Sequence, residues 1–372
     1  MIEPIREWYQ RNFSDPQAVI LALLLISAFL LIWLLGGVLA PVLVALVFAY
    51  LLDGVVTAMQ RYHIPRPLAA ATVMLVFVFF CLLLLFGVMP LLSQQVTSLI
   101  KELPKMIAAG QGQLQRLPEL YPAVFTTEQI NTLISDVRSQ VGRWGQGFLS
   151  FSIASALNLF VIAIYLVLVP LIVFFALKDK PMLVDWARGF MPNRSQLAEK
   201  VWNEADAKIA NYIRGKFIEI MIVWLVSYIT FALMDLNYAV LLSFLVGISV
   251  IIPFVGAVVV TLPIAIIAYF QWGFTAKLGY LLAAYQIIQI LDGNVLVPLL
   301  FSEVVDLHPL AIIISVLFFG GLWGILGVFF AIPLAALMQA VLDAWPRHRG
   351  GSAVEAHTEP VEKAGAAQQK QA

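Results

Sequence analysis

Three polar side chains recur at every third position of one apolar stretch. Gln286, Gln289 and Asp292 lie in residues 275–299, and on a helix this spacing gives a polar stripe about 120° wide. The glutamines fall near the middle of the stretch, and Asp292 lies about 7 Å further along the axis, inside a hydrocarbon half-thickness of about 15 Å. A charged Asp at that depth costs at least about 2.5–3.5 kcal/mol. We expect the stripe to face a cavity, a partner group or a proton path; a structural hydrogen bond to a neighbouring helix is the competing explanation.

Four further polar residues lie at or beyond the end of this stretch: Asn294, Glu303, Asp306 and His308. Asn294 would extend the solute or ion pathway that the polar stripe lines, and the other three residues would gate this pathway or bind a cation. Alternatively, all four only end the helix at the membrane surface. Three acidic residues at the ends of other apolar stretches are interpreted as structural, because water and headgroups lower their cost there: Asp53, Glu219 and Asp235.

Two long apolar segments are interrupted in a similar way. Residues 238–271 are broken at Pro253 and Gly256. Residues 309–343 are broken by four glycines: Gly320, Gly321, Gly324 and Gly327. Each segment is too long for one upright span and barely long enough for two, which predicts a helical hairpin, either re-entrant or fully crossing. Paired interrupted segments are typical of transport sites, where unwound backbone meets the ligand; close packing through small residues is the alternative.

Other chemistry is not indicated by the sequence. No Gly-x-x-x-x-Gly-Lys-Ser/Thr loop for ATP and no His-Glu-x-x-His zinc site is present, and the single Cys81 forms no intrachain disulfide. The Gly-x-Ser triplet ending at Ser249 is a very weak protease signal, and we expect that hydroxyl to bond along its own helix. We therefore predict no enzyme activity, no catalytic residues, no metal site and no cofactor.

The composition requires a lipid environment. Of 372 residues, 62% are hydrophobic and 12% charged, with mean hydropathy +0.93 and formal net charge zero. A soluble domain is roughly 45–50% apolar and about 25% charged, so the excess apolar surface must face lipid. This excludes a cytosolic enzyme, a secreted disulfide scaffold and a disordered protein. The balanced charge gives no indication of nucleic-acid binding.

The stretches free of charge predict an all-α polytopic membrane protein with about eight spans, two of them the broken hairpins. We divide the chain into a three-span region 1–92, an extracytoplasmic helical excursion 93–150, a fourth span 151–177, a cytoplasmic amphipathic excursion 178–217, a membrane core 218–345 and a disordered tail 346–372. Residues 178–217 carry eight Lys/Arg against five in 93–150, which places them, and both termini, in the cytoplasm. Gly36-Gly37 is expected to turn the chain between the first two spans, and residues 197–213 to lie on the membrane surface or in a solvated loop.

The C-terminal third resembles a known family, the autoinducer-2 exporters of bacterial membranes, and most resembles their permease branch. The main motifs are Ile252-Pro253-Phe254-x-Gly256-Ala257, Asp292-Gly293-Asn294-x-Leu296-Val297-Pro298, Leu307-His308-Pro309-Leu310 and Phe319-Gly320-Gly321-Leu322-Trp323-Gly324. The resemblance covers nearly the whole chain and implies a multi-pass transporter of the bacterial inner membrane, energised without ATP. It also implies a homo-oligomer, with a pentamer as the expectation. Many members have Gly shortly after the Asn-x-x-x-Pro element, where this chain has Phe301-Ser302-Glu303, so a substrate does not transfer directly.

Our first hypothesis is a secondary transporter or exporter of a small polar solute, coupled to H+ or Na+. Asp292 would be the proton or cation site, Gln286 and Gln289 would line the path, and Gly256 and Gly327 would permit close backbone approach. The alternatives are a membrane scaffold or regulatory protein that docks through its two excursions, and an oligomeric pore without gradient coupling.

Overall fold

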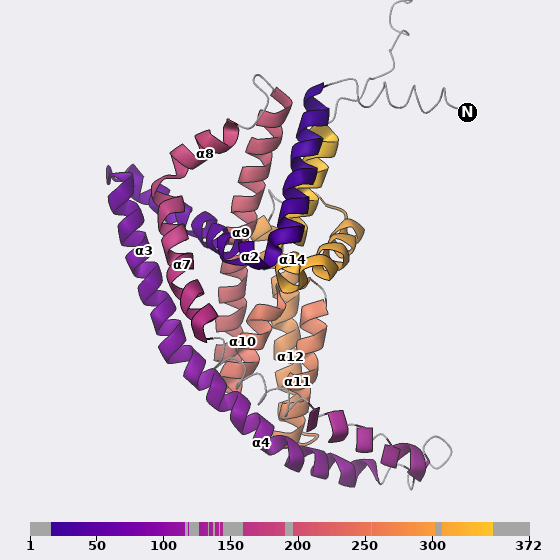
Figure 1. The fold of residues 1–372 in the computed structure, drawn as a ribbon. Coiled ribbons are helices and arrows are strands. Elements are labelled where there is room, and N and C mark those ends of the chain that lie inside the picture. Colours follow the sequence, from indigo (N-terminus) through magenta and orange to yellow (C-terminus); the bar gives the residue numbers. More distant parts are fainter. Residues whose placement is uncertain are drawn as a thin grey trace, which may run out of the picture.

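The computed structural model describes a protein made of helices that lie side by side (Figure 1). It describes residues 16–115, 118, 126–143 except 133, 137 and 141, 159–189, 196–253, 255–301 and 307–344. The tail 346–372, Glu303, Asp306 and much of the 93–150 excursion lie outside the described residues. Within the described part every regular element is helical.

The N-terminal half contains four long helices and two short elements. Their bounds are α2 Pro16–Arg61, α3 Arg66–Leu83, the π-helical turn η1 Leu84–Val88, α4 Met89–Leu114, α7 Leu159–Lys178 and α8 Lys180–Arg188. Because η1 joins α3 directly to α4, these three elements form one long curved helix along the left and lower edge of Figure 1. The third span therefore continues without a break into the 93–150 excursion.

The C-terminal half is built around one central helix. Its elements are α9 Gln196–Leu233, α10 Ala239–Ser249, α11 Val255–Trp272, α12 Ala276–Leu291, the π-helical turn η2 Asp292–Leu296, α13 Val297–Phe301 and α14 Pro309–Ala344. In Figure 1, α10, α11 and α12 gather around the lower part of α9, and the end of α14 runs beside α2.

Three apolar clusters hold these helices together. One packs α9, α10, α11 and α12 around buried Phe231 and Tyr285. A second packs α2, α3 and α7 around Val56 and Val173. A third, around Tyr212 and Phe301, joins α9 to α13, α14 and α2. The third cluster thus connects the N-terminal helices to the C-terminal bundle.

Most residues of the apolar helices are at least partly exposed on the outer surface of the protein. Six helical stretches are long and apolar enough to cross a membrane, and two shorter apolar helices, Ile164–Lys178 and Ala239–Ser249, accompany them. In the most apolar part of each of the six, only 17–28% of the residues are buried. Surfaces of this kind require hydrocarbon as their solvent, which confirms a polytopic helical membrane protein.

Two local expectations are wrong in detail. Gly36-Gly37 forms no separate turn, because both residues lie inside helix α2; Figure 1 shows instead that this one helix bends sharply along its length. No separate surface helix exists at residues 197–213 either, since α9 runs unbroken from Gln196 to Leu233. The apolar face of that stretch packs inside the protein through Tyr212 and Ile213.

Both interrupted segments fold back on themselves. A Cβ added at Gly256 would lie 1.8 Å from the carbonyl oxygen of Ser249, and one added at Gly327 would lie 1.8 Å from that of Phe319. In an uninterrupted helix, residues seven or eight apart are separated by about 10–12 Å. The second reversal passes through Gly324, whose φ of 62° and ψ of −136° are not helical. The predicted hairpin shape is therefore present in both segments.

Candidate functional site

A cavity of about 400 Å³ lies beside the turn of the first hairpin. Its walls come from α9, from the α12–η2–α13 helix, from the α10–α11 turn and from α14. Five polar side chains line it: Tyr212, Lys216, Glu219, Gln289 and Asp292. The rest of the lining is mostly apolar, so these five groups determine the chemistry of the cavity.

Lys216 and Glu219 form a buried ion pair one helical turn apart on α9. The Lys216 Nζ lies 2.8 Å from the Glu219 Oε2, and the two side chains are only 6% and 3% exposed. The ammonium group also lies 5.6 Å from the centre of the Phe301 ring, within range of a cation–π interaction. Taking two charges out of water is costly even when they are paired. A pair at this depth therefore suggests a role other than stability.

Asp292 provides a second carboxyl group in the same cavity. The residue is 9% exposed, and its Oδ1 has no hydrogen-bond partner in the part of the chain that the structure describes. The Gln289 Nε2 and the Tyr212 hydroxyl are likewise buried without such a partner. Buried polar groups are almost always satisfied by protein, water or ligand. Two carboxyl groups and one ammonium, together with an unused amide and hydroxyl, make a site suited to a cation, a proton or a small polar solute.

The hairpin turn gives this site its backbone contribution. Helix α10 ends at Ser249 and α11 begins at Val255, and Pro253 from the turn between them lines the cavity. Gly256 allows the two helices to approach within backbone contact, and the Tyr285 hydroxyl donates to the Ala257 carbonyl oxygen at 2.9 Å, which ties α12 to α11. The hydroxyl of Ser249 donates to the Val246 carbonyl oxygen at 2.7 Å, as expected for a serine bonding along its own helix.

The structure brings only part of the predicted stripe to the cavity. Gln289 and Asp292 line it, whereas Gln286 is exposed on α12. Asn294 is also exposed, and its Nδ2 donates to the Ile290 carbonyl oxygen at 2.9 Å. His308 is exposed, and its Nδ1 accepts from the Leu310 N–H at 3.2 Å at the start of α14.

The predicted pathway glycines are not among the cavity-lining residues. The glycine set of α14, Gly320, Gly321, Gly324 and Gly327, shapes the second reversal instead. Helix α14 contributes the apolar Ile312 and Ile332 to the lining. In the described residues no group of three or more His, Cys, Asp or Glu side chains could hold a metal ion.

Sequence reasoning missed Tyr212, Lys216 and Glu219. From the sequence, Lys216 is one of the eight cations of the predicted cytoplasmic excursion, and Glu219 is predicted to lie at the end of a span. Both lie within one apolar helical stretch, Val201–Leu233. An available signal was their i, i+3 spacing next to Tyr212 and Ile213, which places an ion pair beside an apolar face.

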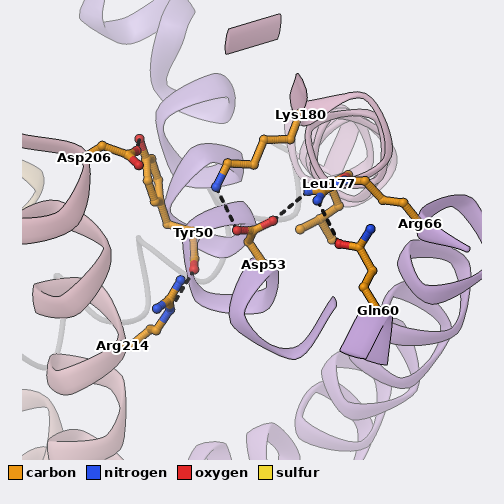
Figure 2. A network of polar contacts seen from close by, with 8 residues as sticks. All are labelled: Tyr50, Asp53, Gln60, Arg66, Leu177, Lys180, Asp206 and Arg214. Carbon is orange, nitrogen blue, oxygen red and sulfur yellow. Dashed lines mark hydrogen bonds and ion pairs between the residues drawn. The ribbon is translucent and has the colours of Figure 1, made fainter. Parts of the chain in front are cut away.

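A second polar cluster joins the N-terminal helices (Figure 2). Asp53 of α2 accepts from the Arg66 Nη2 at 2.7 Å through one oxygen and pairs with the Lys180 Nζ at 2.8 Å through the other. Arg66 also donates from Nε to the Leu177 carbonyl oxygen at the end of α7, at 2.8 Å, where a cation opposes the negative end of the helix dipole. The structural role expected for Asp53 agrees with these contacts.

Tyr50 extends this cluster toward the C-terminal bundle. Its hydroxyl donates to the Asp206 Oδ1 of α9 at 2.7 Å, and its carbonyl oxygen accepts from the Arg214 Nε at 3.4 Å. Figure 2 shows Tyr50 and Asp53 pointing to different partners from the same helix. One turn of α2 therefore contacts both α9 and the α3–α7–α8 group.

An outer surface of apolar helices, together with a cavity that five polar side chains line, is typical of a multi-pass membrane transporter. Comparison with known proteins makes this specific: the model described as "AI-2E family transporter" matches residues 19–347. The chain belongs to this family of transport proteins.

Three relatives illustrate the range of similarity. The chain is 46% identical over 346 residues to "Putative permease PerM" of Escherichia coli K12, covering 93% of this chain and 98% of the relative. It is 27% identical to "Putative transport protein YueF" of Bacillus subtilis, covering 81% and 82%. It is 25% identical to "AI-2 transport protein TqsA" of Escherichia coli K12, covering 82% and 86%. The predicted family resemblance, including its permease branch, is confirmed.

Proposed function

We propose that this protein is a secondary transporter that exports a small polar solute in exchange for H+ or Na+, and that Asp292 carries the coupling ion. The observation that supports this most directly is the Asp292 carboxyl group, buried without a protein partner among the described residues, in a cavity whose only lysine is already paired. With all three groups ionised, Glu219 and Asp292 outweigh Lys216 by one negative charge. A proton or one monovalent cation would neutralise that excess.

Gln289 and Tyr212 would bind the solute in this proposal. Each offers a buried polar atom with no partner in the described chain, and both face the same cavity as Asp292. The unwound turn at Pro253 would add backbone groups, as in other transporters with interrupted helices. The relative TqsA is named for AI-2 transport, so autoinducer-2 is one solute to test.

Its setting would be a bacterial inner membrane, with both termini in the cytoplasm and several copies assembled as a homo-oligomer, with a pentamer as the first expectation. The excess of Lys and Arg in residues 178–217 over 93–150 supports this orientation. Reporter fusions at the C-terminus and after residue 115 test it, because only one of the two positions would then be cytoplasmic.

The coupling proposal is tested by ion flux in proteoliposomes. A pH-sensitive dye trapped inside reports proton movement when a gradient of autoinducer-2 is applied, with or without Na+, and Asp292→Asn is expected to reduce that flux to the level of empty vesicles. Asp235→Asn is the matched control, because that carboxylate is 89% exposed and is not among the residues that line the cavity. Unchanged flux and unchanged pH dependence in Asp292→Asn would contradict the proposal. Conductance that neither saturates nor follows an ion gradient would favour a pore instead.

A further inference from the structure

A second hollow, of about 260 Å³, lies on the other side of Asp292, between α9 and the α12–η2 helix. Its wall contains four well-exposed apolar side chains, Ile222, Val226, Leu291 and Val295, which are 40%, 41%, 53% and 56% exposed. We call this hollow, with Asp292 as its one ionisable group, the lateral groove. Because both helices are candidate membrane spans, the groove opens toward the hydrocarbon of the bilayer.

Asp292 is shared by the lateral groove and the internal cavity. It begins the π-helical turn Asp292–Leu296, and such turns shift the side-chain register of a helix and occur often at functional sites. Its Oδ1 has no partner in the described chain, and the residue is nine-tenths buried. Asp292 therefore lies at the inner end of a groove whose surface is almost entirely apolar, with its carboxyl group buried just behind that surface.

We propose that the lateral groove binds an amphipathic organic cation, with its alkyl part along Leu291 and Val295 and its ammonium group at Asp292. The charge of Asp292 is complementary to that of the ligand, because Lys216, the one lysine among the described residues of the neighbouring cavity, is held by Glu219 and by the Phe301 ring. The apolar walls match an alkyl chain and offer nothing to a second polar group. This inference rests on the proposed transport function and goes beyond it, since it adds a second class of compound, one that enters sideways from the membrane.

The test measures access to Asp292 from the lipid, in full-length protein in lipid nanodiscs. The lipophilic reagent N,N′-dicyclohexylcarbodiimide adds to a carboxylic acid and yields a stable N-acylurea, with no atoms lost, so peptide mass spectrometry identifies the labelled residue. We expect labelling of Asp292. Decyltrimethylammonium at about ten times its Kd should slow that labelling about tenfold, because only about one groove in eleven then stays free. Decanol and decyl sulfate, which have the same chain but no positive charge, should leave the rate within about twofold of the unprotected rate.

Two substitutions of the same kind separate the groove from the cavity. Val295 lines the groove and Val297 lines the cavity. Val295→Phe should fill the groove and slow the labelling of Asp292 by about tenfold or more, whereas Val297→Phe should leave the labelling and its protection by the cation in place. Because Val295 is half exposed to lipid, the larger side chain does not threaten folding.

Three results would overturn the proposal. They are no labelling of Asp292, equal protection by decanol or decyl sulfate, and loss of labelling in Val297→Phe with normal labelling in Val295→Phe. None of these measurements depends on transport. If they fail while Asp292→Asn still abolishes ion flux, the lateral groove is rejected and the proposed coupling role stands.

Discussion

Replacing Gly256 by alanine tests the close backbone contact of the first hairpin. The added Cβ would lie 1.8 Å from the Ser249 carbonyl oxygen and 2.6 Å from its carbon, whereas ordinary contact begins near 3.4 Å. The carbonyl would have to retreat by the difference, 3.4 − 1.8 = 1.6 Å, and it belongs to backbone that cannot rotate away. Overpacking of this kind costs about 3 kcal/mol or more, against a gain of about 1 kcal/mol for alanine over glycine in an open helix.

Thermal unfolding of the purified protein in detergent, followed by size-exclusion chromatography, measures this cost. The net cost of about 2 kcal/mol or more is expected to lower the unfolding midpoint of Gly256→Ala by about 4 °C or more, at about 2–4 °C per kcal/mol. Gly279→Ala is the matched control, because a Cβ there meets nothing within 4 Å, and it should leave the midpoint unchanged or raised. If Gly256→Ala unfolds at the wild-type temperature, the proposed backbone contact is wrong.

Three further changes test the polar interior. Lys216→Met should lower the free energy of unfolding by about 3–5 kcal/mol, because it leaves Glu219 buried and unpaired, and adding Glu219→Gln should restore most of that loss; equal losses in the single and double variants would contradict this. Asp53→Asn should destabilise by about 2 kcal/mol, since two cations lose their shared partner, and an unchanged unfolding midpoint would show that the ion pairs contribute nothing. Tyr212→Phe should change stability by less than about 0.5 kcal/mol, because it removes a hydroxyl without a protein partner, yet it should reduce solute flux in proteoliposomes; normal flux would exclude a role in solute binding.

Much of the fold could be predicted because lipid imposes simple rules on a sequence. Long runs without charge identify helices, and the composition excludes a soluble protein. The two reversals were predictable from Pro253, Gly256 and the glycines of residues 320–327, since paired interruptions in apolar segments rarely allow a straight helix. The predicted similarity of residues 238–271 and 309–343 is supported, because in both segments a glycine packs against a carbonyl oxygen seven or eight residues earlier.

Helix continuity could not be predicted in the same way. A run without charged residues shows which part of a helix can lie in lipid, but it does not show where that helix ends. Helix α9 extends well beyond its apolar run and carries the buried Lys216–Glu219 pair within it, and α2 continues through Gly36-Gly37 and Pro41. Such outcomes depend on tertiary contacts, which a single sequence does not contain.

The candidate-site residues that could be predicted are those whose burial in lipid would cost the most free energy. Asp292 and Gln289 are predicted as site residues because no oppositely charged residue lies near them in their apolar stretch. Gln286 belongs to the same stripe but lies at its edge, and the structure leaves it exposed on α12. Lys216 and Glu219 neutralise each other, so their combined free-energy cost in a membrane is hard to recognise from the sequence. The pair that completes the site is therefore its least predictable part.

The Asp53 ion pairs fix the point at which the N-terminal helices meet. A single carboxylate bridges α2, α3 and the start of α8, and Arg66 adds the end of α7. The same group of helices reaches the C-terminal bundle at two separate places: α2 contacts α9 through Tyr50 and Arg214, and α4, which continues α3, is hydrogen-bonded to the start of α10. A tilt of the cavity-bearing helices against the N-terminal helices would therefore have to change both sets of contacts together.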